Sequence, residues 1–279
     1  MKNDYERAKD NSYIAKKKAL NAMNNQLRIS LLQCDMQWKD PKANFRRIGQ
    51  MSPAYDQSDL VVLPEMFATG FIMDPEQSAL AHREAVAFMH ELAQKTGAVV
   101  CGSLAVEDSG DYYNRFYAVN ASDIVAVYDK KHLFALAGEH HRYKAGAQAL
   151  TFEVNGFRIR PIICYDLRFP VWCRLELPYD LLLCVANWPA PRINAWDTLL
   201  SARAIENQCF SAGVNRVGLD PNNNSYPGHS AAYDGLGKQL CFSQEEEVLS
   251  VVLALDEVKK LRESLPYLSD RDHFMLKFL

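Results

Sequence analysis

The sequence predicts an α/β fold in which strands alternate with helices near both ends of the chain and strands alone occupy the middle. Strand-then-helix order is typical of βα layers, whereas consecutive strands without helices favour antiparallel pairing. A length of 279 residues would allow two domains. No Ser/Gly-rich linker and no internal repeat divides the chain, however. We therefore expect one domain over residues 27–279, preceded by a polar extension over residues 1–26.

Strands are expected where short apolar runs lie between turn-forming residues. These runs cover residues 27–33, 59–63, 98–104, 113–119, 124–128, 157–163, 180–186, 209–215 and 248–255. Helices are expected where apolar side chains recur at three- and four-residue spacing. These segments cover residues 41–51, 76–96, 170–177, 193–207 and 256–263.

The composition excludes several classes of protein. The 31 Lys and Arg residues nearly balance the 34 Asp and Glu residues, which argues against nucleic acid or an anionic membrane as the main partner. The longest apolar runs are far shorter than the ~20 residues of a membrane helix. The seven cysteines include no Cys-x-x-Cys pair, so we expect a reducing compartment, the cytoplasm. The first 26 residues lack the apolar core of a signal peptide. Met23 is a candidate alternative start, because patterned sequence begins only at Leu27.

Several common sites have no counterpart in the sequence. It contains no phosphate-binding G-x-x-x-x-G-K-[ST] loop, no complete G-x-G-x-x-G and no G-x-S-x-G. His140 and His141 are adjacent, so they cannot both point at one metal from a regular helix or strand. Without clustered Cys ligands or an H-E-x-x-H motif, we expect no metal site.

Glu65 is the first reactive side chain. It follows an apolar strand in the segment DLVVLPEMFATGF, beside Met66, Phe67 and Phe71. Partial desolvation would raise the pKa of this carboxylate and suit it to act as a general base. The alternative is a strand-end glutamate that points to solvent.

A pair of lysines follows the strand in the segment IVAVYDKKHLF. Because side chains alternate along a strand, Lys130 and Lys131 point to opposite faces, and only one of them can face a shared pocket. The alternative is a charged, solvated strand exit.

Cys164 ends a β-rich run in the segment FRIRPIICYDLRFPVWCR. At a junction between strand and helix, backbone N–H groups and the helix dipole would favour a thiolate and create a site for an oxyanion. The alternative is a buried structural cysteine, which is what we expect of Cys184 and Cys209.

Taken together and in this order, the three segments resemble the motifs of the nitrilase superfamily of carbon–nitrogen hydrolases. That family has a Glu–Lys–Cys triad, and the match assigns its members to Glu65, Lys130 and Cys164. It selects Lys130 over Lys131 and extends from about residue 27 to residue 271. The segments YDKKHLFALAGEHHRYKAG, VANWPAPR and ARAIENQ resemble the bacterial ω-amidase branch. Members of that branch hydrolyse the terminal amide of 2-oxoglutaramate or 2-oxosuccinamate.

The resemblance implies a fold, an assembly and further site residues. The fold would be a four-layer αββα sandwich. The assembly would be a homodimer or a higher homo-oligomer, to which the C-terminal segment PYLSDRDHFMLKFL could contribute. A second glutamate of the family matches Glu139, for which a solvated loop acid is the alternative. Lys130 and the backbone N–H of Tyr165 would stabilise the oxyanion. The mechanism would use no cofactor and no metal.

Substrate-binding residues are expected from the chemistry of a 2-oxo dicarboxylic monoamide, which carries a carboxylate remote from the scissile amide. An arginine fork matches a carboxylate, and Arg168 would share a face with Cys164 if a helical turn followed the nucleophile. Phe67 and Trp188 are the expected apolar walls.

Alternatives remain for the residue that binds the substrate carboxylate and for the function of the protein. Arg168 could instead pair with Asp166 or Glu206, leaving the carboxylate to Arg192 or His229. The protein could be another hydrolase of the family, such as a nitrilase, a carbamoylase or an aliphatic amidase. A third alternative is a non-catalytic binding protein on the same fold.

Overall fold

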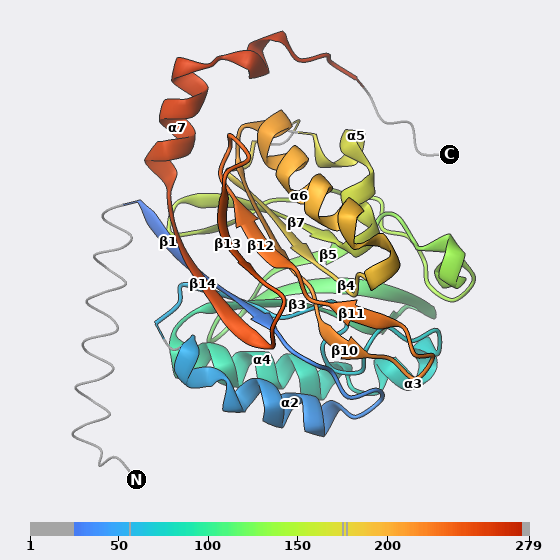
Figure 1. Cartoon of the computed structure of the whole chain (residues 1–279). Coiled ribbons are helices and arrows are strands. Elements are labelled where there is room, and N and C mark those ends of the chain that lie inside the picture. The colour runs from blue at the N-terminus through green and yellow to red at the C-terminus, as the bar shows by residue number, and fades with distance from the viewer. Residues whose placement is uncertain (1–24, 56, 175, 177, 275–279) are drawn as a thin grey trace, which may run out of the picture.

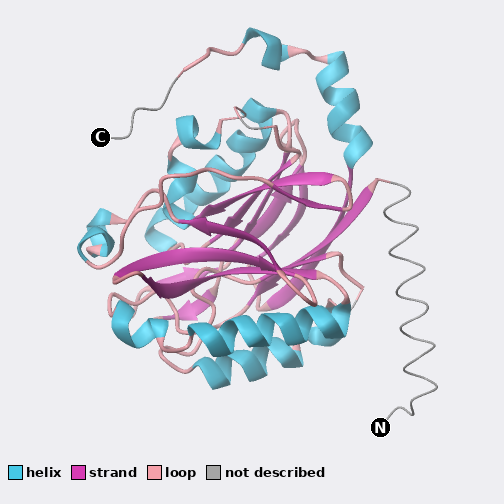
Figure 2. Ribbon diagram, turned by 180° about the vertical axis from the view of Figure 1, so that it is seen from behind, coloured by secondary structure: helices cyan, strands magenta, loops and turns pink. Residues whose placement is uncertain are grey.

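Two six-stranded sheets pack face to face, and helices cover their outer faces (Figures 1 and 2). The computed structural model describes residues 25–274 except 56, 175 and 177. Its layers follow the order helix, sheet, sheet, helix, so the expected four-layer αββα sandwich is confirmed. Most of the expected 1–26 extension, including Met23, lies outside the described residues, as do residues 275–279.

The first sheet has the strand order β14-β1-β2-β3-β4-β5. Strands β1, β2 and β3 are parallel, whereas β3, β4 and β5 pair antiparallel, as do β1 and β14. The bounds are β1 (Gln26–Gln33), β2 (Leu60–Val62), β3 (Val99–Asp108), β4 (Asp111–Val119), β5 (Ile124–Asp129) and β14 (Glu247–Ala254). Helices α2 (Pro41–Gln50) and α4 (His82–Thr96) cover its outer face (Figure 1).

The second sheet has the order β13-β12-β9-β8-β7-β6, with β7, β8 and β9 parallel. Its bounds are β6 (Phe152–Val154), β7 (Phe157–Ile163), β8 (Leu181–Val185), β9 (Phe210–Val214), β12 (Ser230–Tyr233) and β13 (Gln239–Ser243). Helices α5 (Pro170–Cys173) and α6 (Ile193–Asn207) lie on its outer side. The remaining elements are the pair β10 (Val217–Leu219) and β11 (Ser225–Pro227), and α7 (Leu255–Ser264) after β14.

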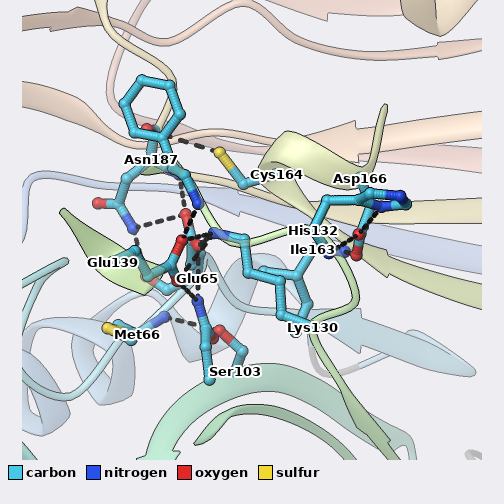
Figure 3. Close-up of polar contacts among 12 residues, drawn as sticks. Glu65, Met66, Ser103, Lys130, His132, Glu139, Ile163, Cys164, Asp166 and Asn187 are labelled. Atoms are coloured by element: carbon cyan, nitrogen blue, oxygen red, sulfur yellow. Dashed lines mark hydrogen bonds and ion pairs between the residues drawn. The ribbon is translucent and has the colours of Figure 1, made fainter. Parts of the chain in front are cut away.

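Alternation along the strands explains how the sheets form the core. In β1, Leu27, Ile29 and Leu31 pack between the sheets, whereas Leu32 faces the cluster beneath the helices. The parallel strands β2, β7 and β8 end at Val62, Ile163 and Val185. The segments that follow these carboxyl ends meet where the two sheets face each other, and they carry the site described below (Figure 3). In the part of the chain described, no helix is both long and apolar enough to span a membrane.

Each of the nine expected strands is present, but two expected helices differ. The helix expected over 76–96 is two helices, α3 (Pro75–Ala79) and α4, because Asp74 caps a separate short helix by accepting from the Gln77 N–H. The helix expected over 170–177 is shorter than predicted. It ends with α5 at Cys173, because the backbone of Arg174 is extended. The short strands β6, β10, β11, β12 and β13 were not expected, since three to five residues with polar members give little pattern.

Candidate active site

Glu65 follows β2 and is completely buried. Its Oε1 accepts hydrogen bonds from Lys130 Nζ at 2.9 Å and from Asn114 Nδ2 at 2.8 Å. Its Oε2 accepts from the Asn187 backbone N–H at 2.8 Å (Figure 3). This carboxylate therefore points into the protein and not to solvent.

Lys130 directly follows β5 and is 1% exposed. Its Nζ donates to Glu65 and also to both oxygens of Glu139, at 3.1 and 2.9 Å (Figure 3). Burial alone would lower the pKa of Lys130, but the charges of Glu139 and Glu65 hold that pKa well above its usual value. The ammonium is therefore charged at neutral pH. Lys131 lies instead with its Nζ 5.8 Å from the ring centroid of Trp172.

Glu139 lies in a short 3₁₀ turn (Glu139–His141) and is also completely buried. Its Oε2 accepts from the backbone N–H of Phe134 at 2.6 Å, in addition to the Lys130 bonds. Burial raises the pKa of this carboxyl group, and the charge of Lys130 opposes that rise. Glu139 is thus part of the buried cluster and not a solvated loop acid.

Asn114, on β4, was not expected from the sequence. Its Nδ2 donates to Oε1 of Glu65 and, at 3.3 Å, to Oε1 of Glu139. Its backbone carbonyl accepts from the N–H of Lys130 at 2.9 Å. One residue thus holds both carboxylates and the lysine backbone. The local sequence gives no signal that could have identified it, because β4 (DYYNRFYAV) also carries Asp111 and Arg115.

Cys164 follows β7 with a left-handed backbone, at φ 45°. Its Sγ lies 3.8 Å from the Asn187 carbonyl oxygen and beside the cluster of Glu65 and Lys130 (Figure 3). Burial raises the pKa of the thiol well above its usual value, and the charge of Glu65 adds to the rise. The resting side chain is therefore a neutral thiol.

The neutral thiol of Cys164 contradicts the expectation that a helix dipole favours the thiolate. The segment after β7 is a five-residue 3₁₀ turn (Cys164–Arg168), followed by the four-residue α5. Neither is long enough to provide a substantial dipole, whereas removal of water from the sulfur strongly favours the uncharged form. Ionisation of the thiol therefore requires a neighbouring base.

Asp166 joins the 3₁₀ turn that begins at Cys164 to the segment that carries Lys130. Its Oδ1 accepts from the backbone N–H and Nδ1 of His132, both at 2.8 Å (Figure 3). Its Oδ2 accepts from the Tyr128 hydroxyl at 2.7 Å and from the Ile163 N–H at 3.0 Å. Four donors thus fix one buried carboxylate, and with it the distance between the two chain segments.

A cavity of about 490 Å³ opens above Cys164. Its aromatic walls include Phe71, Phe134 and the expected Trp188. Tyr165 and Arg168 also line it, so Arg168 does share a pocket with Cys164, although a 3₁₀ turn and not an α-helix separates them.

Phe67 does not line this cavity, contrary to expectation. It is completely buried in the cluster beneath the outer helices, where its ring centroid lies 6.3 Å from that of Phe45. The preceding residue, Met66, has a left-handed backbone at φ 46°. Strand-like alternation fails across such a residue, so Glu65 and Phe67 do not share a face.

Arg168 pairs with neither of the two carboxylates considered as its internal partners, Asp166 and Glu206. Asp166 is taken up by the four donors above, and Glu206 pairs with Arg203 at 3.0 Å. The Arg168 guanidinium lies 4.8 Å from the centroid of the Trp188 ring and has no hydrogen bond or ion pair among the described residues. His229, the other alternative, pairs with Asp197 at 2.9 Å and does not line the cavity.

The chain was compared with known families and structures. Residues 28–263 match the family model described as carbon-nitrogen hydrolase. The protein belongs to the carbon–nitrogen hydrolase family. The matched range includes every residue assigned to the site above. In the described part of the chain, no group of three or more His, Cys, Asp or Glu side chains could hold a metal ion.

Individual relatives of this carbon–nitrogen hydrolase resemble it over most of its length. It is 43% identical to the omega-amidase YafV of Yersinia enterocolitica, over 90% of this chain and 98% of that protein. It is 36% identical to the 2-oxoglutaramate amidase of Bacillus subtilis, over 87% and 96% of the two chains. Among solved structures, XC1258 of Xanthomonas campestris superposes with a TM-score of 0.86 at 40% identity, covering 90% of this chain and 99% of that one.

Proposed function

We propose that this protein is an amidase that hydrolyses the terminal amide of short 2-oxo dicarboxylic acid monoamides, such as 2-oxoglutaramate and 2-oxosuccinamate, to the acid and ammonia. The observation that carries the proposal is the charged Lys130, buried between Glu65 and Glu139 beside the Cys164 thiol. The similarity to an omega-amidase and a 2-oxoglutaramate amidase supports this choice of substrate.

The first half of the reaction forms a thioester. Glu65 takes the thiol proton as the sulfur of Cys164 attacks the amide carbon. The negative charge that develops on the amide oxygen is stabilised by Lys130 and by the N–H of Tyr165. Tyr165 is the second residue of its 3₁₀ turn, where N–H groups have no partner within the turn. Glu65 then protonates the leaving nitrogen, and ammonia departs.

The second half releases the acid. Glu65, again a carboxylate, accepts a proton from water as the water attacks the thioester carbon. The tetrahedral intermediate expels the sulfur, which takes the proton back from Glu65, and the carboxylic acid leaves. Lys130 remains charged throughout because Glu139 faces it as well as Glu65, so that a second carboxyl group still contacts the ammonium when Glu65 is protonated.

The cavity suits the acyl part of this substrate. The guanidinium of Arg168, stacked against Trp188, is available to bind the distal carboxylate of the substrate. Trp188 and Phe71 provide apolar walls for the methylene groups between the carboxylate and the amide.

The proposal is tested by measuring ammonia release over a panel of amides, nitriles and carbamoyl compounds. We expect the highest kcat/KM with 2-oxoglutaramate or 2-oxosuccinamate. Preference for a nitrile, or carbon dioxide release from a carbamoyl compound, would favour another hydrolase of the family. Absence of turnover on the whole panel, with the protein folded, would indicate a binding protein.

We further propose that residues 27–279 form one hydrolase domain and that the protein acts as a homodimer in the cytoplasm. The exposed Tyr267 and Phe274 support a role for the C-terminal segment in assembly. Light scattering of the full chain and of a chain ending at Leu265 tests this idea. A dimer that is unchanged by truncation would exclude the segment from the interface.

A further inference from the structure

Arg192 is a second cation of the cavity without a counter-ion. It lines the same cavity as Cys164 and Arg168 and is half-buried. In the described part of the chain its guanidinium has no hydrogen bond or ion pair, and it lies 5.0 Å from the ring centroid of Phe134. A half-buried arginine without a carboxylate partner keeps its hydrogen-bond donors available to a ligand.

The backbone of Arg192 is held firmly. Its N–H donates to the Pro189 carbonyl at 3.0 Å, and its carbonyl accepts from Trp188 Nε1 at 2.7 Å. The ring of the same Trp188 lies beneath the guanidinium of Arg168. One tryptophan therefore contacts both arginine residues, and aromatic rings fix the position of both guanidinium groups before any ligand arrives.

The acidic groups near the two arginines are already engaged. Asp74 pairs with Lys39 at 3.3 Å. Asp220 accepts hydrogen bonds from Asn222, Asn224 and Tyr226 within its own loop. Glu65 and Glu139 surround Lys130. An anion that enters the cavity meets two available cations, whereas an ammonium group meets no carboxylate that lacks a partner among the described residues.

We propose that Arg192 is a specificity-determining residue, which shares the 2-oxo acid end of the substrate with Arg168 and makes the site reject 2-amino acid amides such as glutamine. This inference rests on the proposed function. A 2-oxo acid end is planar and presents three oxygens, enough for two planar guanidinium forks. Glutamine would place an ammonium group between two like charges, where repulsion and desolvation disfavour it.

The test compares wild type, Arg192→Met, Arg192→Lys and Lys144→Met on 2-oxoglutaramate, on L-glutamine and on the neutral amide butyramide. Removing one charged hydrogen-bonding partner is expected to lower kcat/KM for 2-oxoglutaramate about 10- to 100-fold, mainly through KM. The rate with butyramide should be nearly unchanged, and the preference for 2-oxoglutaramate over glutamine should shrink. Arg192→Lys should recover part of the loss. Lys144→Met, which removes a cation that is paired with Asp111 outside the cavity, should lose much less.

A second measurement does not require turnover. 2-Oxoglutarate, which lacks the amide, should protect Cys164 of the wild type from alkylation by iodoacetamide, and Arg192→Met should weaken this protection. Equal losses on 2-oxoglutaramate and butyramide, unchanged kinetics and protection in Arg192→Met, or an equal effect of Lys144→Met would each overturn the inference. If 2-oxoglutarate protected Cys164 but no amide were hydrolysed, the proposed function would be wrong, whereas the inference of an anion site at Arg192 would still hold.

Discussion

Replacing Lys130 with Met removes the charge that holds the candidate site together. The substitution deletes three hydrogen bonds of 2.9 to 3.1 Å and leaves Glu65 and Glu139 buried without a cation. Loss of an oxyanion partner typically costs ~10²–10³ in kcat. Breaking a buried ion pair by removing one partner costs about 3–5 kcal/mol of unfolding free energy.

The stability loss should fall at the lower end of that range. Glu65 keeps the donors Asn187 and Asn114, and Glu139 keeps Phe134 and Asn114. Burial already raises the pKa of Glu139, so without the lysine this group can bind a proton and remove one of the two charges.

The assay measures ammonia release and urea unfolding for Lys130→Met, Lys131→Met and the double variant Lys130→Met/Glu139→Gln. The neutral glutamine should restore part of the stability because it removes an uncompensated charge, but it should not restore the rate. Lys131→Met should stay close to wild type in rate, because Lys131 lies toward Trp172 and not in the cluster.

Two results would refute this reasoning. If Lys130→Met retained nearly full kcat while folded, the lysine would not stabilise the transition state. If Lys131→Met and Lys130→Met lost activity equally, the effect would come from the charge of the segment as a whole and not from the contacts of Lys130.

Four further substitutions test other parts of the site. Cys164→Ala should abolish ammonia release while leaving the thermal midpoint close to wild type, and near-native turnover would show that the nucleophile is another residue. In Glu65→Gln, iodoacetamide should label Cys164 slowly at neutral pH, because burial still raises the pKa of the thiol and no carboxylate remains at position 65 to accept its proton. Wild type should react at neutral pH, and equal rates in mass spectrometry would exclude Glu65 as the base. Asp166→Asn should lower both kcat and the thermal midpoint, because the amide cannot accept all four hydrogen bonds as the carboxylate does; an unchanged kcat would count against a positioning role. Arg168→Met should raise KM for 2-oxoglutaramate and spare propionamide, whereas proportional losses on both would make Arg168 structural.

The parts of the fold that the sequence predicts are those that depend on local pattern. The strand ends expected at residues 63, 128 and 163 lie within one residue of the observed ends of β2, β5 and β7. Alternation alone shows that one of two lysines faces a pocket, and the family resemblance selects Lys130. The buried environment of Lys130 agrees with that choice.

The parts that the sequence does not predict depend on contacts between distant residues. Asn187 lies 122 residues after Glu65, to which its backbone N–H and side chain both donate. Nothing in the local pattern around either residue indicates this pairing. The prediction for Phe67 is wrong for a different reason. It rested on the position of Phe67 beside Glu65, but the backbone of Met66 between them is left-handed and Phe67 packs beneath the outer helices.

The site is divided between the two sheets, and this division explains why long-range contacts dominate it. Glu65 and Lys130 follow strands of the first sheet, whereas Cys164 and Asn187 follow strands of the second. The bonds from Asn187 to Glu65 therefore cross from one sheet to the other. Packing of the sheets also buries the charged cluster, which is tolerable only because every member has a partner. The same packing that stabilises the fold thus assembles the Glu65 carboxylate, the Lys130 ammonium and the Cys164 thiol in one place.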